Sequence, residues 1–271
     1  MQNREPDYND YVEIADGTYW VGFTDENAGF HCNPYLIVDN EEAVLIDSGS
    51  RNDFSTVMLK IMRTGTDPRR IKRLIYQHYD PDLCGNIPHM EALIGNSDLK
   101  ILSHKENNIF IHYYSVKSSK ECVEDQNLCF SFSSGRKLLF IRTPYAHSSG
   151  SFVTYDTKTK VLFSSDLFGS NGTDWRLFTS VFGECANCTP VSPCPKTKKM
   201  CEIIGTWNFH KSVMTSTKAL RYALSQIQKL DISLIAPQHG SILHNPLSCK
   251  IVTDRLMSLT GVGIDSFLEG E

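Results

Sequence analysis

One stretch of the sequence indicates the fold class more directly than the rest: Leu74-Ile75-Tyr76-Gln77-His78-Tyr79-Asp80-Pro81-Asp82-Leu83. It joins an apolar run, typical of a buried strand, to a polar turn with one imidazole and two carboxylates. Alternate side chains of an extended segment share a face, so the spacing of two predicts that His78, Asp80 and Asp82 point the same way. Pro81 stiffens the turn, because it fixes its own φ and restricts the residue before it.

Two interpretations of this turn are open from its residues alone. Grouped carboxylates repel each other unless a cation or a proton offsets their charge, which favours a metal site. The alternative is a polar turn in which the aspartates hydrogen-bond their own backbone, as in Asx turns. The rest of the sequence bears on this choice.

Three other apolar runs also end next to a side chain that can bind a metal. Leu138–Ile141 precedes His147, Val161–Phe163 precedes Asp166, and Leu234–Ile235 precedes His239. Residues just beyond strand ends are held by a rigid scaffold while their side chains reach open space. Imidazoles and carboxylates gathered at one sheet edge form a site that suits iron, zinc or manganese. For Asp166 taken alone, a helix-capping carboxylate is the alternative.

The pattern around these runs predicts an α/β (α+β) protein with two sheets stacked together and helices outside. We expect a single domain over residues 1–271, with a Cys- and Pro-rich insertion at about 183–202. Period-two runs predict strands at 12–14, 19–23, 35–38, 43–46, 71–76, 100–102, 137–141, 151–155, 160–163 and 232–236. Helical spacing of apolar residues predicts helices at 54–62, 87–94 and 220–230.

Taken together, these motifs resemble the metallo-β-lactamase superfamily, and within it the flavodiiron-like branch of oxygen-binding diiron proteins (ODP). The resemblance rests on His78-x-Asp80-x-Asp82, His147, Asp166 and Pro237-Gln238-His239-Gly240 in this order. It extends to residues 33–38, 44–49 and 165–169. The resemblance implies the four-layer αββα sandwich of that superfamily, which agrees with the two-sheet interpretation.

The resemblance also implies a ligand set for two iron ions. His78, Asp80 and His147 would hold one iron, Asp82 and His239 the other, and Asp166 would bridge them. Zinc hydrolases of this superfamily generally carry a second histidine where Asp80 stands. An additional anionic ligand favours ferric iron, a hard cation, over zinc, which is bound more often by imidazole and thiolate.

Two positions depart from the family pattern. Asp80 stands where the diiron proteins usually carry glutamate, so its carboxylate is one methylene shorter. Leu83 stands where the family normally supplies another histidine, and leucine cannot bind a metal. Our hypothesis is that the second iron has one protein ligand fewer and that this open position tunes the site toward oxygen. Asp47 matches the superfamily's Asp-x-Gly turn and is expected to support the metal loop rather than to bind metal.

The resemblance therefore predicts a non-haem diiron protein that binds O₂ or NO. It would act as an oxygen sensor or as an O₂/NO reductase, and whether it is an enzyme stays open at this point. Because the chain ends at Glu271 with no room for a flavodoxin domain, electrons or signals are expected to pass through a separate partner. A homodimer is an open alternative. The rival interpretations are a zinc-dependent hydrolase of an ester, thioester or phosphodiester, and an interaction module whose site is empty.

The cysteines form a second constellation. Cys185-x-x-Cys188, followed by Cys194 and Cys201, offers four thiols that could hold an additional metal. Reduced thiols in an irregular insertion are the alternative. The other five are expected to be apolar thiols, with Cys84 notable because it lies close to Asp82.

The composition excludes several classes of function. The 271 residues contain 27 Lys+Arg and 31 Asp+Glu, so the formal net charge is −4. This charge lacks the basic excess that is typical of proteins that bind nucleic acid or anionic lipid. No apolar run approaches the roughly 18 residues that suggest a membrane span. Residues 1–17 lack the basic and apolar regions of a secretory signal, so we expect a cytoplasmic protein without membrane or nucleic-acid partners.

Overall fold

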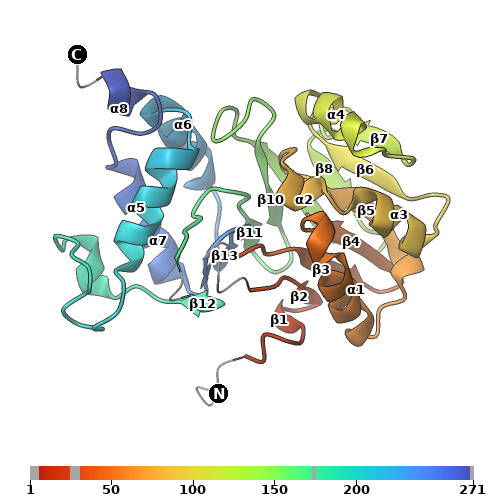
Figure 1. Cartoon of the computed structure of the whole chain (residues 1–271), viewed down its shortest axis with the longest axis horizontal. Helices are drawn as coiled ribbons and strands as arrows, with labels where there is room; N and C mark the ends of the chain where they lie inside the picture. The colour runs from red at the N-terminus through yellow and green to blue at the C-terminus, as the bar shows by residue number, and fades with distance from the viewer. Residues whose placement is uncertain (1–5, 25–30, 173–174, 269–271) are drawn as a thin grey trace. The chain divides into compact units, whose positions relative to one another are not determined.

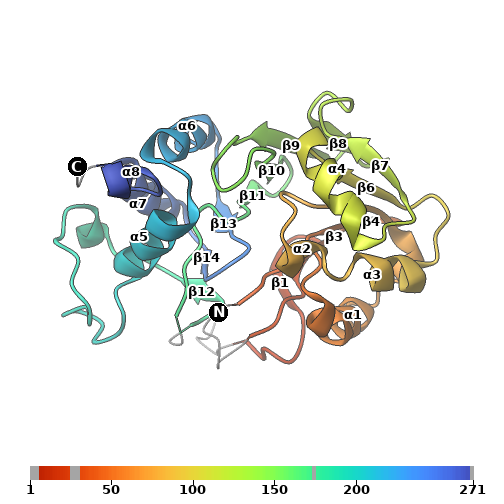
Figure 2. The same cartoon turned by 45° about the horizontal axis from the view of Figure 1, so that its top comes forward.

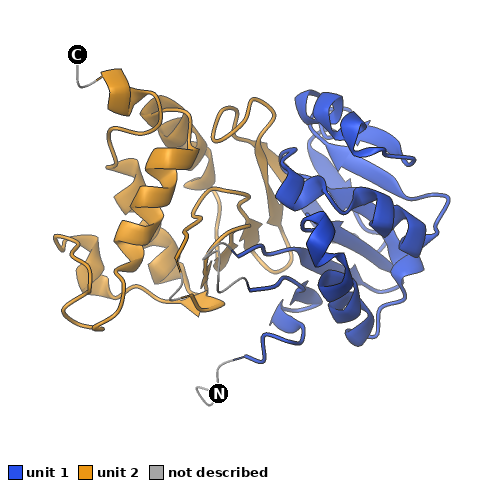
Figure 3. Cartoon of the chain, viewed as in Figure 1, with its two compact units in different colours: residues 1–24, 31–138 blue, residues 25–30, 139–271 orange. Residues whose placement is uncertain are grey.

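The computed structural model describes residues 6–24, 31–172 and 175–268 of the chain, which forms two compact units (Figure 3). Unit 1 comprises residues 1–24 and 31–138, and unit 2 comprises residues 25–30 and 139–271. The expectation of a single domain stays a prediction.

Unit 1 contains a seven-stranded sheet with the strands in chain order, β1-β2-β3-β4-β5-β6-β7. The first four strands form an antiparallel meander, and β4, β5 and β6 then run parallel. The strands are β1 (Val12–Ala15), β2 (Thr18–Trp20), β3 (Tyr35–Asp39), β4 (Glu42–Ile46), β5 (Ile71–Ile75), β6 (Lys100–Ser103) and β7 (Ser119–Cys122). The helices are α1 (Phe54–Arg63), α2 (Pro81–Cys84), α3 (Ile87–Ile94) and α4 (Lys105–Ile111). Short 3-10 turns are η1 (Arg51–Asp53), η2 (Pro68–Arg70) and η3 (His112–Tyr114), and β8 (Cys129–Ser131) follows.

The core of unit 1 lies between one face of this sheet and the helices α1 and α3, which cover it (Figure 1). Side chains of a strand alternate between faces, so Ala43 and Leu45 of β4 join this core whereas Val44 and Ile46 point to the other face. The helices contribute apolar residues at helical spacing. These include Val57, Met58 and Ile61 of α1 and Ile87, Met90 and Ile94 of α3.

In unit 2 the strand order is β12-β14-β13-β11-β10-β9. Strand β11 runs antiparallel to β10 and parallel to β13. The strands are β9 (Lys137–Arg142, which begins in unit 1), β10 (Phe152–Asp156), β11 (Val161–Phe163), β12 (Phe178–Thr179), β13 (Leu234–Ala236) and β14 (Ile242–Leu243). The helical segments are η4 (Gly183–Ala186), α5 (Glu202–Val213), α6 (Thr217–Ile227), α7 (Pro246–Met257) and α8 (Asp265–Leu268).

Helices α5, α6 and α7 pack together against the sheet of unit 2 and lie side by side in both views (Figures 1 and 2). The predicted amphipathic helix is α6, whose Leu220, Ala223 and Leu224 belong to the same apolar core as Leu162 and Ile235 of the sheet. The Ser216 hydroxyl caps α6 by accepting the Ala219 N–H at 3.2 Å. This apolar stripe explains why the sequence predicts α6.

The predicted strands and the helices at 54–62, 87–94 and 220–230 match elements of the structure within a few residues. The sequence did not predict α4, α5, α7, β7 or β8. Helices α5 and α7 lack a clean apolar stripe, because buried polar residues such as Thr206, His210 and Thr253 interrupt it. None of the helices in the described parts of the chain is long and apolar enough to cross a bilayer.

Candidate metal centre

The loop after β5 carries the first group of predicted ligands. Strands β4, β5 and β6 are parallel, with Ile46 opposite Ile75 and Ile75 opposite Leu102. Their carboxyl ends therefore lie at one edge of the sheet. His78 comes off this edge directly after β5, as the sequence predicts.

His78, Asp80 and Asp82 converge as predicted. One ligand atom from each of the three lies within 4.8 Å of the others, and His78 Nε2 is 3.8 Å from Asp80 Oδ2. The backbone conformation differs from the predicted extended segment. Asp80 is the N-cap of α2, and Asp82 lies in the first turn of that helix. Pro81 starts the helix, since its fixed φ and missing N–H suit the first helical position.

Hydrogen bonds from three other elements hold this loop. The Asp47 carboxylate accepts the Gln77 N–H at 3.4 Å, so Asp47 contacts the backbone of this loop. The Ser103 hydroxyl donates to the Tyr76 carbonyl at 2.5 Å, and the Tyr114 hydroxyl donates to the Tyr79 carbonyl at 2.9 Å. The ligands of unit 1 are thus attached to a backbone that is restrained on both sides of His78.

Strand register brings Asp166 and His239 together in unit 2. In the parallel pair of β11 and β13, Phe163 lies opposite Ala236, and each predicted ligand lies three residues farther along the chain. His147 reaches the same edge because it precedes β10, and the antiparallel pairing of β10 with β11 places the start of β10 beside the end of β11. Ligands that are remote in sequence therefore meet by strand pairing.

Asp166 lies between the two histidines of unit 2. Its Oδ2 is 3.7 Å from His147 Nδ1, and its Oδ1 is 3.7 Å from His239 Nε2. These distances are too long for direct hydrogen bonds. Two ligands on one cation, each at about 2.0–2.2 Å, lie no more than about 4.4 Å apart, so both distances leave room for a shared ion. The two oxygens of Asp166 face different imidazoles, as a bridging carboxylate requires.

Unusual backbone conformations position the loops of unit 2. His147 has φ of 99°, and Ser165 and Phe168 on either side of Asp166 also have positive φ. Such conformations are costly for residues other than glycine and persist where the surroundings enforce them. Gly240, with φ of 82°, follows His239; a Cβ there would lie 2.2 Å from the Ser170 hydroxyl.

His210 anchors the loop that carries Asp166, a role that the sequence analysis did not foresee. Its Nδ1 lies 2.7 Å from the Thr206 carbonyl, and its Nε2 accepts the Phe168 N–H at 3.0 Å. Burial lowers the pKa of His210 to about 4, so the ring is neutral at pH 7 with its proton on Nδ1. Nothing in the local sequence around His210 signals this contact.

Leu83 and Cys84 belong to the apolar core of unit 1 rather than to the ligand group. The Leu83 side chain is fully buried in that core. The Cys84 thiol donates to the His78 carbonyl at 3.8 Å, and burial raises its pKa well above the usual value. Cys84 therefore packs as a neutral thiol.

The four cysteines of the insertion are all free thiols. They do not occur among the groups of three or more potential ligand atoms within 4.8 Å that the described residues form. Cys201 is buried, and Cys185 and Cys194 pack against the core of unit 2. The predicted additional metal at Cys185, Cys188, Cys194 and Cys201 gains no support from this geometry.

The donor atoms at the strand ends fit iron. Unit 1 offers His78 with Asp80 and Asp82, and unit 2 offers Asp166 with His147 and His239; taken separately, each is a hard set of imidazole and carboxylate donors of the kind that non-haem iron uses. Each unit contributes both imidazole and carboxylate groups, held on restrained loops.

Comparison with known proteins identifies the fold. The solved structure of the peroxy diiron species of the chemotaxis sensor ODP superposes with a TM-score of 0.73 over 94% of each chain, at 24% identity. The rubredoxin oxygen:oxidoreductase of Desulfovibrio gigas gives a TM-score of 0.74 at 19% identity, over 91% of this chain and 60% of that one. The metallo-β-lactamase-like fold predicted from the sequence, with two sheets and outer helices, is confirmed.

The family follows from the sequence itself. The model of the ODP family beta lactamase matches residues 30–240, and the chain belongs to this family. The matched segment includes all six predicted ligands. The anaerobic nitric oxide reductase flavorubredoxin of Salmonella arizonae is 28% identical over 216 residues, 72% of this chain and 44% of that protein. The chain spans about half the length of the curated relatives that it matches.

Proposed function

We propose that this chain is a non-haem diiron protein that binds O₂ and acts as an oxygen sensor. The observation that carries the proposal is the position of Asp166, with one carboxylate oxygen directed at His147 and the other at His239. A carboxylate that faces an imidazole on each side is suited to joining two cations. The grouping of His78, Asp80 and Asp82 adds three donors to the set.

The six residues would divide between two irons in the way that the family resemblance implies. His78, Asp80 and His147 would hold one ion, Asp82 and His239 would hold the other, and Asp166 would be shared between them. When bound, two ferrous ions supply the electrons with which such centres bind dioxygen reductively. The three aspartates offset most of the charge of two divalent cations, and the restrained loops keep the donors in place.

The share of both chains that one structural match covers favours sensing over reduction. The solved structure that matches over 94% of both chains is that of a chemotaxis sensor, and in this chain a signalling partner would read the oxygenated state. The nitric oxide reductase relatives support the alternative, an O₂/NO reductase supplied by a separate electron donor. Both functions use the same centre and differ in the step after oxygen binds.

Anaerobic loading with Fe²⁺ followed by stopped-flow mixing with O₂ tests the proposal. We expect two irons per chain and a fast spectral change to a species that persists in the absence of reductant. Repeated consumption of O₂ or NO with an added electron donor would instead establish a reductase. A protein that retains only zinc and hydrolyses an ester, thioester or phosphodiester would contradict the proposal.

A further inference from the structure

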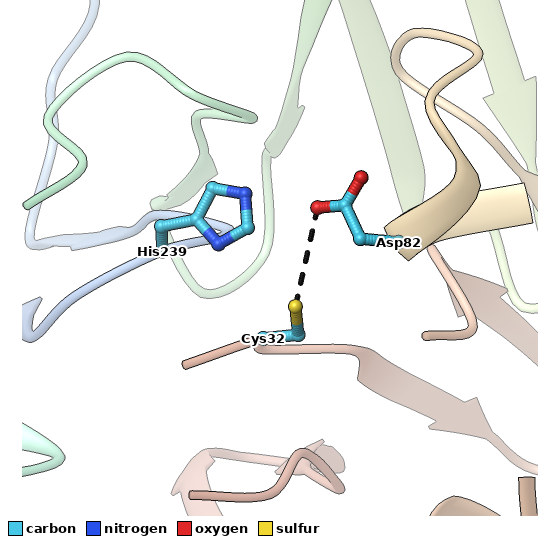
Figure 4. Close-up of side chains that lie close together, drawn as sticks. All are labelled: Cys32, Asp82 and His239. Atoms are coloured by element: carbon cyan, nitrogen blue, oxygen red, sulfur yellow. Dashed lines mark hydrogen bonds between the residues drawn. The ribbon is translucent and has the colours of Figure 1, made fainter. Parts of the chain in front are cut away.

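Cys32 lies next to the ligand loop of unit 1, although its sequence context gives no sign of a metal site. It is buried with 4% of its surface exposed, three residues before β3. Its Sγ is 3.9 Å from Oδ2 of Asp82, and the two side chains point toward each other (Figure 4). Asp82 also groups with His78 and Asp80, so this carboxylate belongs to two candidate ligand groups, and Cys32 is a member of one of them.

A hydrogen bond alone is a weak explanation for this contact. A thiol is a poor donor, and 3.9 Å is at the outer limit for sulfur. A cation between the two groups accounts for the separation better: bond lengths of about 2.3 Å to sulfur and about 2.1 Å to oxygen allow up to about 4.4 Å between the ligand atoms. The distance therefore fits two ligands of one ion.

The neighbouring cysteine behaves differently. Cys84 is closer in sequence to Asp82, but its thiol contacts the His78 carbonyl and its side chain belongs to the apolar core. Cys32 Sγ instead faces a carboxylate oxygen that the ligand series assigns to the second iron. Proximity in the chain thus does not identify the thiol that can serve as a ligand.

We propose that Cys32 is a thiolate ligand of the second metal, together with Asp82, and that it supplies the protein ligand missing at Leu83. This inference rests on the proposed function. Metal binding forms the Cys32 Sγ–metal bond and breaks the S–H bond, and the proton leaves to solvent. The two metal positions then differ chemically: the first has only nitrogen and oxygen donors, and the second has a soft sulfur donor.

Titration of the metal-free protein with Co²⁺ tests this assignment, because thiolate ligation gives a charge-transfer band in the near ultraviolet that nitrogen and oxygen ligands do not. We expect two Co²⁺ per chain and this band in the wild-type protein. Cys32→Ser should lose the band and bind the second Co²⁺ at least about 10-fold more weakly. Cys129→Ser is the matched control, since Cys129 is a partly exposed thiol of the same unit, and it should behave as wild type.

The outcomes separate this inference from the proposed function. Two bound Co²⁺ without a sulfur band, or a band that persists in Cys32→Ser, would overturn the role of Cys32 and leave the two-metal proposal standing. Failure of the wild-type protein to bind two metals would remove both. If Cys32→Ser does not fold, ¹¹³Cd-loaded wild-type protein supplies the answer: scalar coupling between ¹¹³Cd and the Cys32 β-protons supports ligation, and its absence contradicts it.

Discussion

The two units provide their predicted metal ligands in contrasting ways. In unit 1, His78, Asp80 and Asp82 come from five consecutive residues, and hydrogen bonds from Asp47 and neighbouring elements restrain one loop. In unit 2, His147, Asp166 and His239 come from three separate loops that strand pairing brings to one edge. The first arrangement is local in sequence and the second depends on the register of the whole sheet. Substitutions should therefore affect the two groups differently.

The largest effect is expected from Asp166→Ala. This change removes the carboxylate that faces both histidines of unit 2. The affinity for both metals should fall by at least about 100-fold, which exceeds the usual effect of losing a residue that only supports a ligand. Metal stoichiometry after Fe²⁺ or Co²⁺ loading measures it. Asp231→Asn, at an exposed position of the same unit, is the control and should keep two metals. Retention of two metals by Asp166→Ala would refute the bridging role.

Gly240→Ala should break the register-dependent group by distorting the loop after β13. The added Cβ would lie 2.2 Å from the Ser170 hydroxyl and 2.8 Å from its amide nitrogen, at a φ of 82°. We expect a loss of about 4 kcal/mol in the free energy of unfolding, from strain and overpacking together. Urea denaturation measures it.

Gly65→Ala is a matched control for this substitution. Gly65 has nearly the same φ, 80°, with nothing within 4 Å of the added Cβ. It should cost only the conformational penalty of about 1 kcal/mol. Equal losses at the two positions would mean that the contact with Ser170 has no role.

The anchor at His210 should make the stability of unit 2 depend on pH. The pKa of His210 is about 4 in the folded chain against 6.5 as its ordinary value, so the folded state binds fewer protons between these limits. Stability is therefore lost as the pH falls from 6.5 to 4, by about 3 kcal/mol from this group. Urea denaturation of metal-free protein at both pH values measures the loss.

His210→Gln cannot titrate in this range and should lack that part of the pH dependence. His112→Gln, at an exposed histidine, should retain it. If the wild-type protein and His210→Gln lose the same stability between the two pH values, the ring is not held neutral in the folded state.

The smallest effect is expected from Tyr114→Phe, which tests the restraint on the loop of unit 1. The substitution removes the hydroxyl that donates to the Tyr79 carbonyl at 2.9 Å and should cost about 1 kcal/mol of stability. Metal affinity should change less than with Asp166→Ala, because several other hydrogen bonds still hold the loop. Thermal unfolding with and without metal measures both effects, and a complete loss of metal would show that this single bond controls the loop.

The contrast between the units also explains what the sequence could predict. The first strands of unit 1, α1 and α6 follow from the local spacing of apolar residues, and the spacing of His78, Asp80 and Asp82 indicates a site directly. His147, Asp166 and His239 were found only as a series at strand ends, completed by a family resemblance. Their grouping depends on pairings such as Phe163 with Ala236, which no local pattern encodes.

The approach of Cys32 to Asp82 and the contact of His210 with Phe168 could not be predicted for the same reason. Each joins segments that are remote in the chain and whose residue types are ordinary where they stand. Buried cysteines and histidines are most often structural. Only the folded structure shows which of them contact a predicted ligand or hold a loop in place.

The pairing of β11 with β13 has a consequence for biogenesis. Val161 meets Leu234 across a long intervening stretch that includes the insertion and helices α5 and α6, so this parallel pair closes a large loop and should form late in folding. The loop of His78 can form from local contacts while synthesis is still under way. Metal capture should then begin on the nascent amino-terminal half, and the ligand group of unit 2 should be complete only after β13 has paired with β11 and His239 has been made.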